Sequence, residues 1–140
     1  MAEADCLFCG IIDGSIPSQT IDSDERTVAF MDINPATPGH ALVVPRRHSG
    51  DLLEIAEEDL TATVLAAQRL ARRMKEVLDA DGINLINACG AAAWQTVFHF
   101  HLHVVPRYRD DPLELPWVPT PGDPDEIAAV AARLRGKNDG

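Results

Sequence analysis

Residues 97–107 read VFHFHLHVVPR, a run that places three histidines at alternate positions. Successive side chains of a β-strand point to opposite faces of the sheet. The apolar face carries Phe98, Phe100, Leu102 and Val104, and the other face carries His99, His101 and His103. This alternation predicts a strand whose apolar face packs inward while its imidazole face lines a surface. At a rise of about 3.3 Å per residue the outer two histidines stand about 13 Å apart, so all three cannot ligate one metal ion, although two neighbours can.

The imidazole face favours chemistry over packing. A lone histidine usually has a packing or hydrogen-bonding role, but burying three rings for packing alone is costly, because each ring has two nitrogens that need partners. Imidazole has an ordinary pKa of about 6.5, so its neutral form is populated near neutral pH and is a good nucleophile toward phosphorus. Flanking histidines can donate hydrogen bonds to phosphate oxygens and pass a proton to the leaving atom. The run therefore indicates a catalytic or ligand-binding face that needs no metal at the phosphate.

Outward from this run, the sequence predicts strands and one long helix. Turn-forming pairs, Asn34-Pro35 and Pro38-Gly39, separate two strand-like segments and favour an antiparallel hairpin. The predicted strands are 26–33, 40–44, 83–88 and 97–105, with a loop at 89–96, a short apolar turn or helix at 6–13 and a short helix at 124–134.

The long helix is predicted for residues 59–79, where apolar positions advance by three or four residues. These positions are Leu60, Val64, Ala67, Leu70, Met74 and Val77. Acidic residues stand at its start, basic residues stand toward its end, and Gly82 follows, as the helix dipole and helix termination favour. We expect this helix to cover one face of the sheet.

Length and charge exclude several classes of protein. The chain has 140 residues, 46% of them hydrophobic, which suits one globular core. Its formal charge of -10 argues against nucleic acid and anionic membranes as partners, so an anionic ligand needs a local pocket. Residues 82–106 carry no charged side chain apart from histidine, but their Asn, Gln and His content indicates buried strands, not a membrane span. The first five residues have no signal-peptide pattern, and we expect a cytoplasmic protein.

Cys6 and Cys9 form a C-x-x-C pair whose meaning the sequence leaves open. Such a pair can bind metal, be redox-active or be incidental, and a closed tetrahedral zinc site needs two further ligands. A thioredoxin-like role lacks its usual context, since no βαβ pattern follows the pair. The third cysteine, Cys89, has no obvious partner in the sequence.

HFHLHVV at 99–105 resembles the H-x-H-x-H signature of the histidine triad (HIT) superfamily. FMDI at 30–33 and PGHALVVPRRH at 38–48 resemble that family's nucleotide-binding hairpin, and Asn87 followed by Gln95 and Thr96 resembles its phosphate-contacting loop. The resemblance runs from about residue 6 to 107 and is closest to the bacterial nucleotide-binding branch that carries an N-terminal C-x-x-C. One departure is Trp94, because the family usually has glycine before the glutamine.

The resemblance implies an α+β fold. Its expected form is a five-stranded antiparallel sheet with one long helix and a short N-terminal helix, and the sheet is extended in a homodimer. Residues 1–140 then form a single HIT domain, of which 109–140 are a C-terminal extension and a partly flexible tail.

The resemblance also implies roles for individual residues. His101 resembles the nucleophile, with His103 and His40 as its polar partners around the phosphate or the leaving group. The substrate-binding residues carried over by position are Phe8, Ile11, Phe30, Asp32, Ile33, Leu42, Asn87, Gln95, Thr96 and Val97. Among these, Asp32 resembles the carboxylate that accepts hydrogen bonds from the ribose hydroxyls. Members that carry the C-x-x-C pair complete a structural zinc site with two histidines, here His48 and His99.

The function implied is hydrolysis of nucleoside phosphoramidates or related nucleotide conjugates through a nucleotidyl intermediate on His101. The ligand expected is a purine nucleotide such as AMP or an AMP conjugate. Two alternatives stay open: a dinucleoside polyphosphate hydrolase, and a zinc-stabilised nucleotide-binding regulatory module in which catalysis is incidental.

Overall fold

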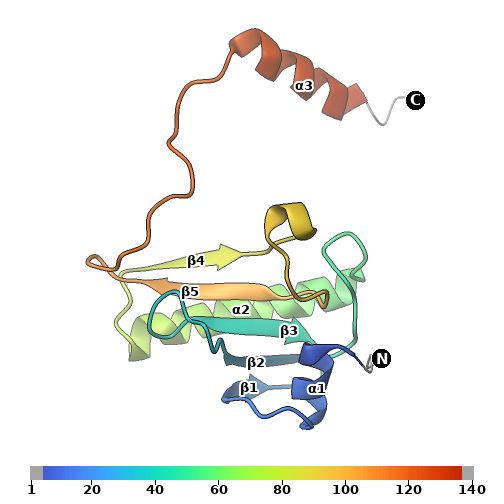
Figure 1. The fold of residues 1–140 in the computed structure, drawn as a ribbon, viewed down its shortest axis with the longest axis vertical. Coiled ribbons are helices and arrows are strands. Elements are labelled where there is room, and N and C mark those ends of the chain that lie inside the picture. Colours follow the sequence, from blue (N-terminus) through green and yellow to red (C-terminus); the bar gives the residue numbers. More distant parts are fainter. Residues whose placement is uncertain (1–4, 137–140) are drawn as a thin grey trace.

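The computed structural model describes residues 5–136, and within them one antiparallel sheet of five strands organises the chain (Figure 1). The strands follow the order β1-β2-β3-β5-β4 across the sheet. Their bounds are β1 Thr20–Ser23, β2 Thr27–Met31, β3 Ala41–Pro45, β4 Gly82–Ile86 and β5 Leu102–Arg107. The hairpin predicted around residues 34–39 is confirmed, because β2 and β3 pair from Thr27 with Pro45 to Met31 with Ala41. The α+β class and the five-stranded antiparallel sheet are thus as expected.

In the described part of the chain, three α-helices and one 3-10 turn complete the fold. They are α1 Leu7–Asp13, α2 Glu57–Val77, the 3-10 turn η1 Ala91–Ala93 and α3 Pro124–Gly136. In Figure 1 α2 lies behind the sheet and α1 lies in front of it. The C-terminal segment leaves the end of β5 and carries α3 away from the sheet, and none of the residues of α3 is buried.

Both faces of the sheet are therefore covered near the centre, and alternate residues of the strands supply two separate cores. Ala29, Ala41 and Val43 pack with Leu70 and Met74 of α2 in the larger core. The intervening residues pack with Phe8 of α1, and they are Val28, Phe30, Leu42 and Val44. Because the strands are buried on both sides, β2 and β3 have nearly continuous burial instead of an alternating pattern.

The buried face of α2 differs from the predicted one. Val64 and Val77 are exposed, whereas Asp59 and Thr63 are buried with Ala67, Leu70 and Met74. The helix can bury these two polar residues because both have partners. The Thr63 hydroxyl donates to the Asp59 carbonyl over 2.6 Å, and Arg47 Nε lies 2.8 Å from the Asp59 carboxylate.

The histidine run is also less regular than predicted, because β5 begins only at Leu102. The backbone N–H of Phe100 donates to the carbonyl of Ser49 over 2.7 Å, a contact outside the sheet ladder. Phe100, Leu102 and Val104 are buried as expected, but Phe98 is 52% exposed, so its inward placement was wrong. The polar strand β1 was not predicted, since all four of its residues are exposed and give no hydrophobic pattern.

No helix in the part of the chain from residue 5 to 136 is both long and apolar enough to cross a membrane. The predicted C-terminal helix is present and runs two residues beyond its expected end. Of the tail predicted to be partly flexible, residues 137–140 lie outside the described part of the chain.

Candidate functional site

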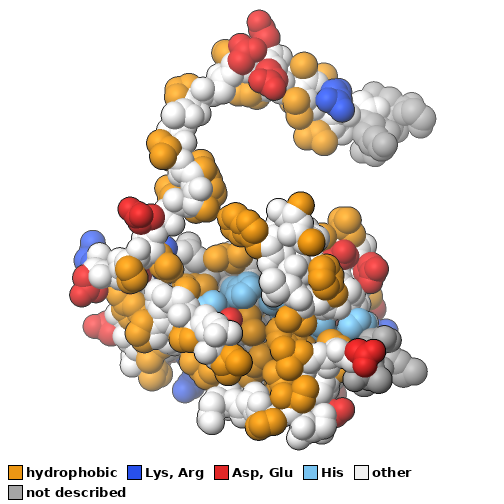
Figure 2. All heavy atoms as spheres, viewed as in Figure 1, with side chains coloured by type: hydrophobic (Ala, Val, Ile, Leu, Met, Phe, Trp, Pro, Cys, Tyr) orange, Lys and Arg blue, Asp and Glu red, His pale blue; other side chains and the backbone are white. Residues whose placement is uncertain are grey.

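A pocket opens on the sheet face that carries α1, and histidine side chains form a band beside it (Figure 2). Its volume is about 340 Å³, within the range of small-molecule sites. Three segments distant in sequence form its walls, namely α1, the β2–β3 hairpin and the run that leads into β5. Ten of the residues singled out from the sequence line it: Phe8, Ile11, Phe30, Asp32, Ile33, Leu42, Thr96, Val97, His101 and His103.

His101 is the most constrained ring of this pocket. Its Nδ1 lies 2.7 Å from the backbone carbonyl oxygen of His99, and only an N–H can donate to that oxygen. A neutral His101 therefore carries its proton on Nδ1 and has its lone pair on Nε2. The amide of Asn87 donates to the His101 carbonyl over 3.0 Å, and the Phe8 ring meets the imidazole edge to face with centroids 5.0 Å apart. The residue is 5% exposed, so backbone and side chain are both fixed.

Asp32, His40 and His103 form a hydrogen-bonded chain beside His101. The backbone N–H of Ala36 donates to Nδ1 of His40 over 2.9 Å, so the proton of a neutral His40 ring is on Nε2. That Nε2 lies 2.9 Å from Nδ1 of His103 and 3.4 Å from the Asp32 carboxylate. His103 then accepts at Nδ1 and keeps its own proton on Nε2.

These three side chains also bring possible metal ligands within 4.8 Å of one another. The hydrogen bond from Ala36 argues against a metal there, because the His40 atom that would ligate is the protonated one. The arrangement suits proton donation better than coordination.

Burial keeps the histidines of this pocket neutral. It lowers the pKa of His101, an effect opposed by the hydrogen bond to the His99 carbonyl and by Asp32. It also lowers the pKa of His40, against the attraction of Asp32. For His103, burial together with repulsion from His101 and His40 lowers the pKa to about 4. Neutral rings at pH 7 retain the lone pair that a nucleophile needs and the N–H that a neutral donor needs.

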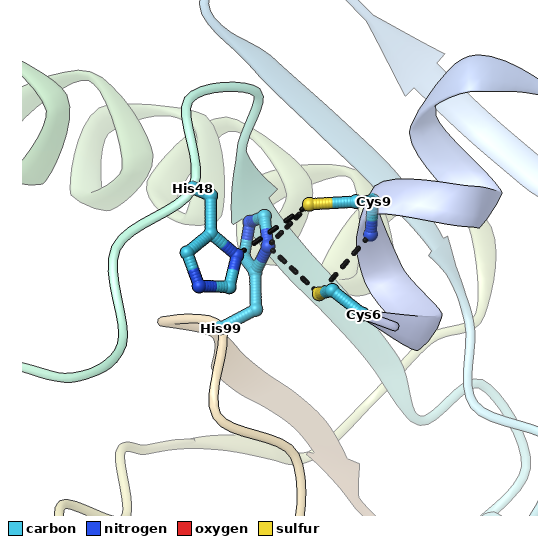
Figure 3. Close-up of side chains that lie close together, drawn as sticks. All are labelled: Cys6, Cys9, His48 and His99. Carbon is cyan, nitrogen blue, oxygen red and sulfur yellow. Dashed lines mark hydrogen bonds between the residues drawn. The ribbon is translucent and has the colours of Figure 1, made fainter. Parts of the chain in front are cut away.

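A second cluster joins α1 to the sheet, and Figure 3 shows its four side chains converging: Cys6, Cys9, His48 and His99. Nδ1 of His99 lies 3.4 Å from Cys6 Sγ and 3.5 Å from Cys9 Sγ, and Nδ1 of His48 lies 3.5 Å from Cys9 Sγ. In a tetrahedral site with Zn–S of about 2.3 Å and Zn–N of about 2.0 Å, a sulfur and a nitrogen stand about 3.5 Å apart. The donor atoms are thus spaced as a tetrahedral metal site requires.

The surroundings of the cluster hold its ligands in a metal-binding form. Nε2 of His99 lies 2.8 Å from the Pro45 carbonyl, so it carries the proton and Nδ1 presents a lone pair to the thiols. Burial lowers the pKa of His99 to about 4, which keeps the ring neutral. The N–H of Cys9 donates to Cys6 Sγ over 3.3 Å. Arg47, which precedes His48 in the sequence, forms an ion pair with the buried Asp59 of α2.

Three of the residues expected to act in catalysis or substrate binding do not line the pocket: His40, Asn87 and Gln95. The buried Gln95 holds backbone together, since its amide nitrogen donates to the carbonyls of Gly50 and Val97 and its oxygen accepts from Gly90 N–H. Two further residues hold the site in place without a clear signal in the sequence. Ala36 contributes a backbone N–H, and Asp59 is an acidic residue next to the apolar face of a helix.

Trp94, the departure from the family pattern, ends η1 with a φ of 79°. This left-handed conformation favours glycine, and a bulky side chain adopts it at a cost. The indole is 73% exposed, so it is not packed into the described part of the chain.

The chain is similar to known proteins in both sequence and fold. The HIT domain profile matches residues 13–110. A HIT-like protein of Mycobacterium tuberculosis is 43% identical over 110 residues, which cover 79% of this chain and 76% of that protein. Two solved structures are also similar. A zinc-bound histidine triad family protein from Mycobacterium smegmatis is 40% identical, with a TM-score of 0.76 over 95% of this chain and 97% of that one. A histidine triad nucleotide-binding protein from Candida albicans is 26% identical, with a TM-score of 0.85 over 96% and 98%.

The low pKa of His103 leads to a direct prediction. The folded chain binds the ring proton near pH 4, whereas an unshifted histidine binds it near 6.5. Between these values the unfolded chain binds more protons, so this ring makes the free energy of unfolding fall as the pH falls from 6.5 toward 4. An NMR titration, with the resonance assigned by His103→Gln, should give a midpoint near the lower value. A midpoint close to 6.5 contradicts a His103 ring whose surroundings hold it neutral.

Proposed function

The chain belongs to the HIT family, and from this premise we propose that it is a nucleotide hydrolase that forms a covalent nucleotidyl intermediate on His101. The observation that carries the proposal is the 2.7 Å contact between His101 Nδ1 and the His99 carbonyl, which leaves the Nε2 lone pair on a ring that lines the pocket. The nucleotide-binding relative from Candida albicans supports a nucleotide as the ligand.

In the first step Nε2 of His101 attacks the phosphorus of the nucleotide. A P–N bond to His101 forms while the bond from phosphorus to the leaving group breaks, and the leaving atom takes a proton. His103 is suited to donate it, because its Nδ1 faces His40 and its own proton is on Nε2. In the second step water attacks the phosphorus and returns a proton to Nε2 of His103, the P–N bond breaks, and the nucleoside monophosphate is released with His101 neutral again.

The remaining residues would either bind the nucleotide or position the residues that bind it. The base would lie against apolar side chains, namely Phe8, Ile11, Phe30, Ile33 and Leu42. Asp32 would accept hydrogen bonds from the ribose hydroxyls, and Thr96 with the backbone at Val97 would contact the phosphate. Asn87 and Gln95 would act on the phosphate loop through the backbone that they hydrogen-bond, and His40 would act through His103.

We rank AMP phosphoramidates first as substrates and dinucleoside polyphosphates second. The pocket volume of about 340 Å³ suits one mononucleotide, and the exposed Trp94 stands in the loop that follows β4. Neither the pocket volume nor the position of Trp94 indicates a binding site for a second nucleoside. Comparable rates on both substrate classes would remove the basis for this ranking.

The Cys/His cluster would hold a structural zinc ion through Cys6, Cys9, His48 and His99. Its support is the donor spacing of 3.4 to 3.5 Å and the zinc-bound relative from Mycobacterium smegmatis. With four protein ligands such a site has no open position, so the metal would contribute to folding and not to the reaction.

The chain would form a homodimer through the free edge of β4. Within residues 5–136 this strand pairs only with β5, and its Leu85 and Ile86 are 50% and 45% exposed. The C-terminal segment adds exposed apolar residues spaced along one side of α3, namely Ile127, Val130 and Leu134. An isolated 13-residue helix is marginal in water, so α3 needs a surface to pack on.

Native mass spectrometry of the full chain tests the zinc and dimer proposals together. The expected species is a dimer that carries two zinc ions. Cys9→Ser should lose the metal because it removes one of four ligands, whereas Cys89→Ser should keep it and serves as the matched control. A monomer contradicts the dimer, and a metal-free chain after refolding with zinc contradicts the metal site.

Turnover of adenosine 5′-phosphoramidate tests the proposed function. His101→Ala should lower kcat by about 10³-fold or more, because it removes the nucleophile, while AMP still binds. Leu53→Ala, which alters an 86% exposed residue, should behave like the parent chain. Binding of AMP without turnover by the parent would contradict the hydrolase and favour a nucleotide-binding module.

A further inference from the structure

We infer that metal binding at the Cys/His cluster and nucleotide binding in the pocket are energetically coupled, with Phe8 and His99 as the positioning residues that connect them. The inference rests on the proposed function, since it assigns the coupling to the same nucleotide pocket. It gives the metal a part in ligand affinity in addition to its part in folding.

The first connection runs through α1. Cys6 caps the helix and Cys9 lies within it, so both thiols belong to one short element. The same helix supplies a wall of the pocket through Leu7, Phe8 and Ile11. A displacement of α1 that separates the thiols from the histidines therefore also moves the pocket wall.

Phe8 is the residue of α1 that reaches the nucleophile. It stands between the two cysteines in sequence and is 4% exposed. Its ring meets His101 edge to face with centroids 5.0 Å apart and meets Phe30 at 5.4 Å. Its position thus fixes one side of the imidazole and one side of the apolar pocket.

The helix has little stability of its own. It spans seven residues, has no acidic residue in its first turn and no basic residue in its last. A helix of this length is not stable in isolation, so its position depends on what holds it to the sheet. Phe8 packs into the apolar core on one side, and the thiols face His48 and His99 on the other. A metal ion would tie that second side directly.

The second connection runs through His99. Its ring faces the thiols and is anchored to the Pro45 carbonyl, while its own backbone carbonyl accepts the hydrogen bond of His101 Nδ1–H. The residue is fully buried, with no exposed surface. A metal that fixes the ring also fixes the peptide group that selects the tautomer of the nucleophile.

Coupling between two binding sites is reciprocal. If the metal increases nucleotide affinity by a given factor, the nucleotide must increase metal affinity by the same factor, and such factors are typically about 5 to 150. A metal site that only supports the fold in a distant region has no such effect on a folded chain.

The test starts from the zinc-loaded full chain. AMP at saturation should lower the equilibrium constant for zinc transfer to a chromophoric chelator at least several-fold, and the AMP dissociation constant should be about 5 to 150 times lower for the zinc-loaded chain than for the metal-free chain. The zinc-transfer measurement starts from the zinc-loaded protein, so it tests the coupling even if the metal-free chain unfolds. Unchanged zinc transfer with AMP bound overturns the inference but leaves the proposed function standing.

Two variants of α1 locate the connection. Phe8→Leu keeps both thiols and should reduce the effect of AMP on zinc transfer. Ile12→Val alters a residue that packs in the same core without lining the pocket, and it should retain the parent's effect. An equal effect of AMP in all three chains contradicts the role of Phe8. Failure of the zinc-loaded parent to bind AMP at all overturns the proposed function, and the inference with it.

Discussion

The hydrogen bond from His101 Nδ1 to the carbonyl of His99 is the constraint on which the rest of the site depends. The chain around it leaves regular strand geometry before Leu102, where the N–H of Phe100 donates to the Ser49 carbonyl instead of to a neighbouring strand. The irregular segment lets the ring of His99 turn toward the thiols of α1 while His101 lines the pocket. The residue His99 thus connects the Cys/His cluster, through its ring, to His101 of the pocket, through its carbonyl.

The burial of both sheet faces gives this segment its support. Alternate residues of β2 and β3 pack against α2 on one face of the sheet and against α1 on the other. The same strands thus contribute to two hydrophobic cores. The resulting desolvation lowers the pKa values of His40, His101 and His103 and keeps the rings neutral. Although the chain has a formal charge of -10, the pocket is lined mostly by apolar groups, with two imidazole rings and the Asp32 carboxylate among them.

Local patterns in the sequence predicted the strands of the hairpin, the long helix and the inward packing of Phe100, Leu102 and Val104. They failed where tertiary contacts decide. The buried face of α2 includes Asp59 because Arg47, distant in sequence, pairs with it, and no helical periodicity contains that information. Likewise Ala36 acts through its backbone N–H and Gln95 through bonds to backbone, so residue type gave no signal for either role. The pairing of Cys6 and Cys9 with two distant histidines came from the family resemblance, not from spacing.

The most direct test of the account is the intact mass of the protein after rapid, acid-free quenching during turnover of an adenosine phosphoramidate. The account requires one added nucleotidyl group per chain, located on His101 by peptide mapping and absent from His101→Ala. Turnover by the parent chain without this adduct, or an adduct that persists in the variant, would contradict covalent catalysis by His101.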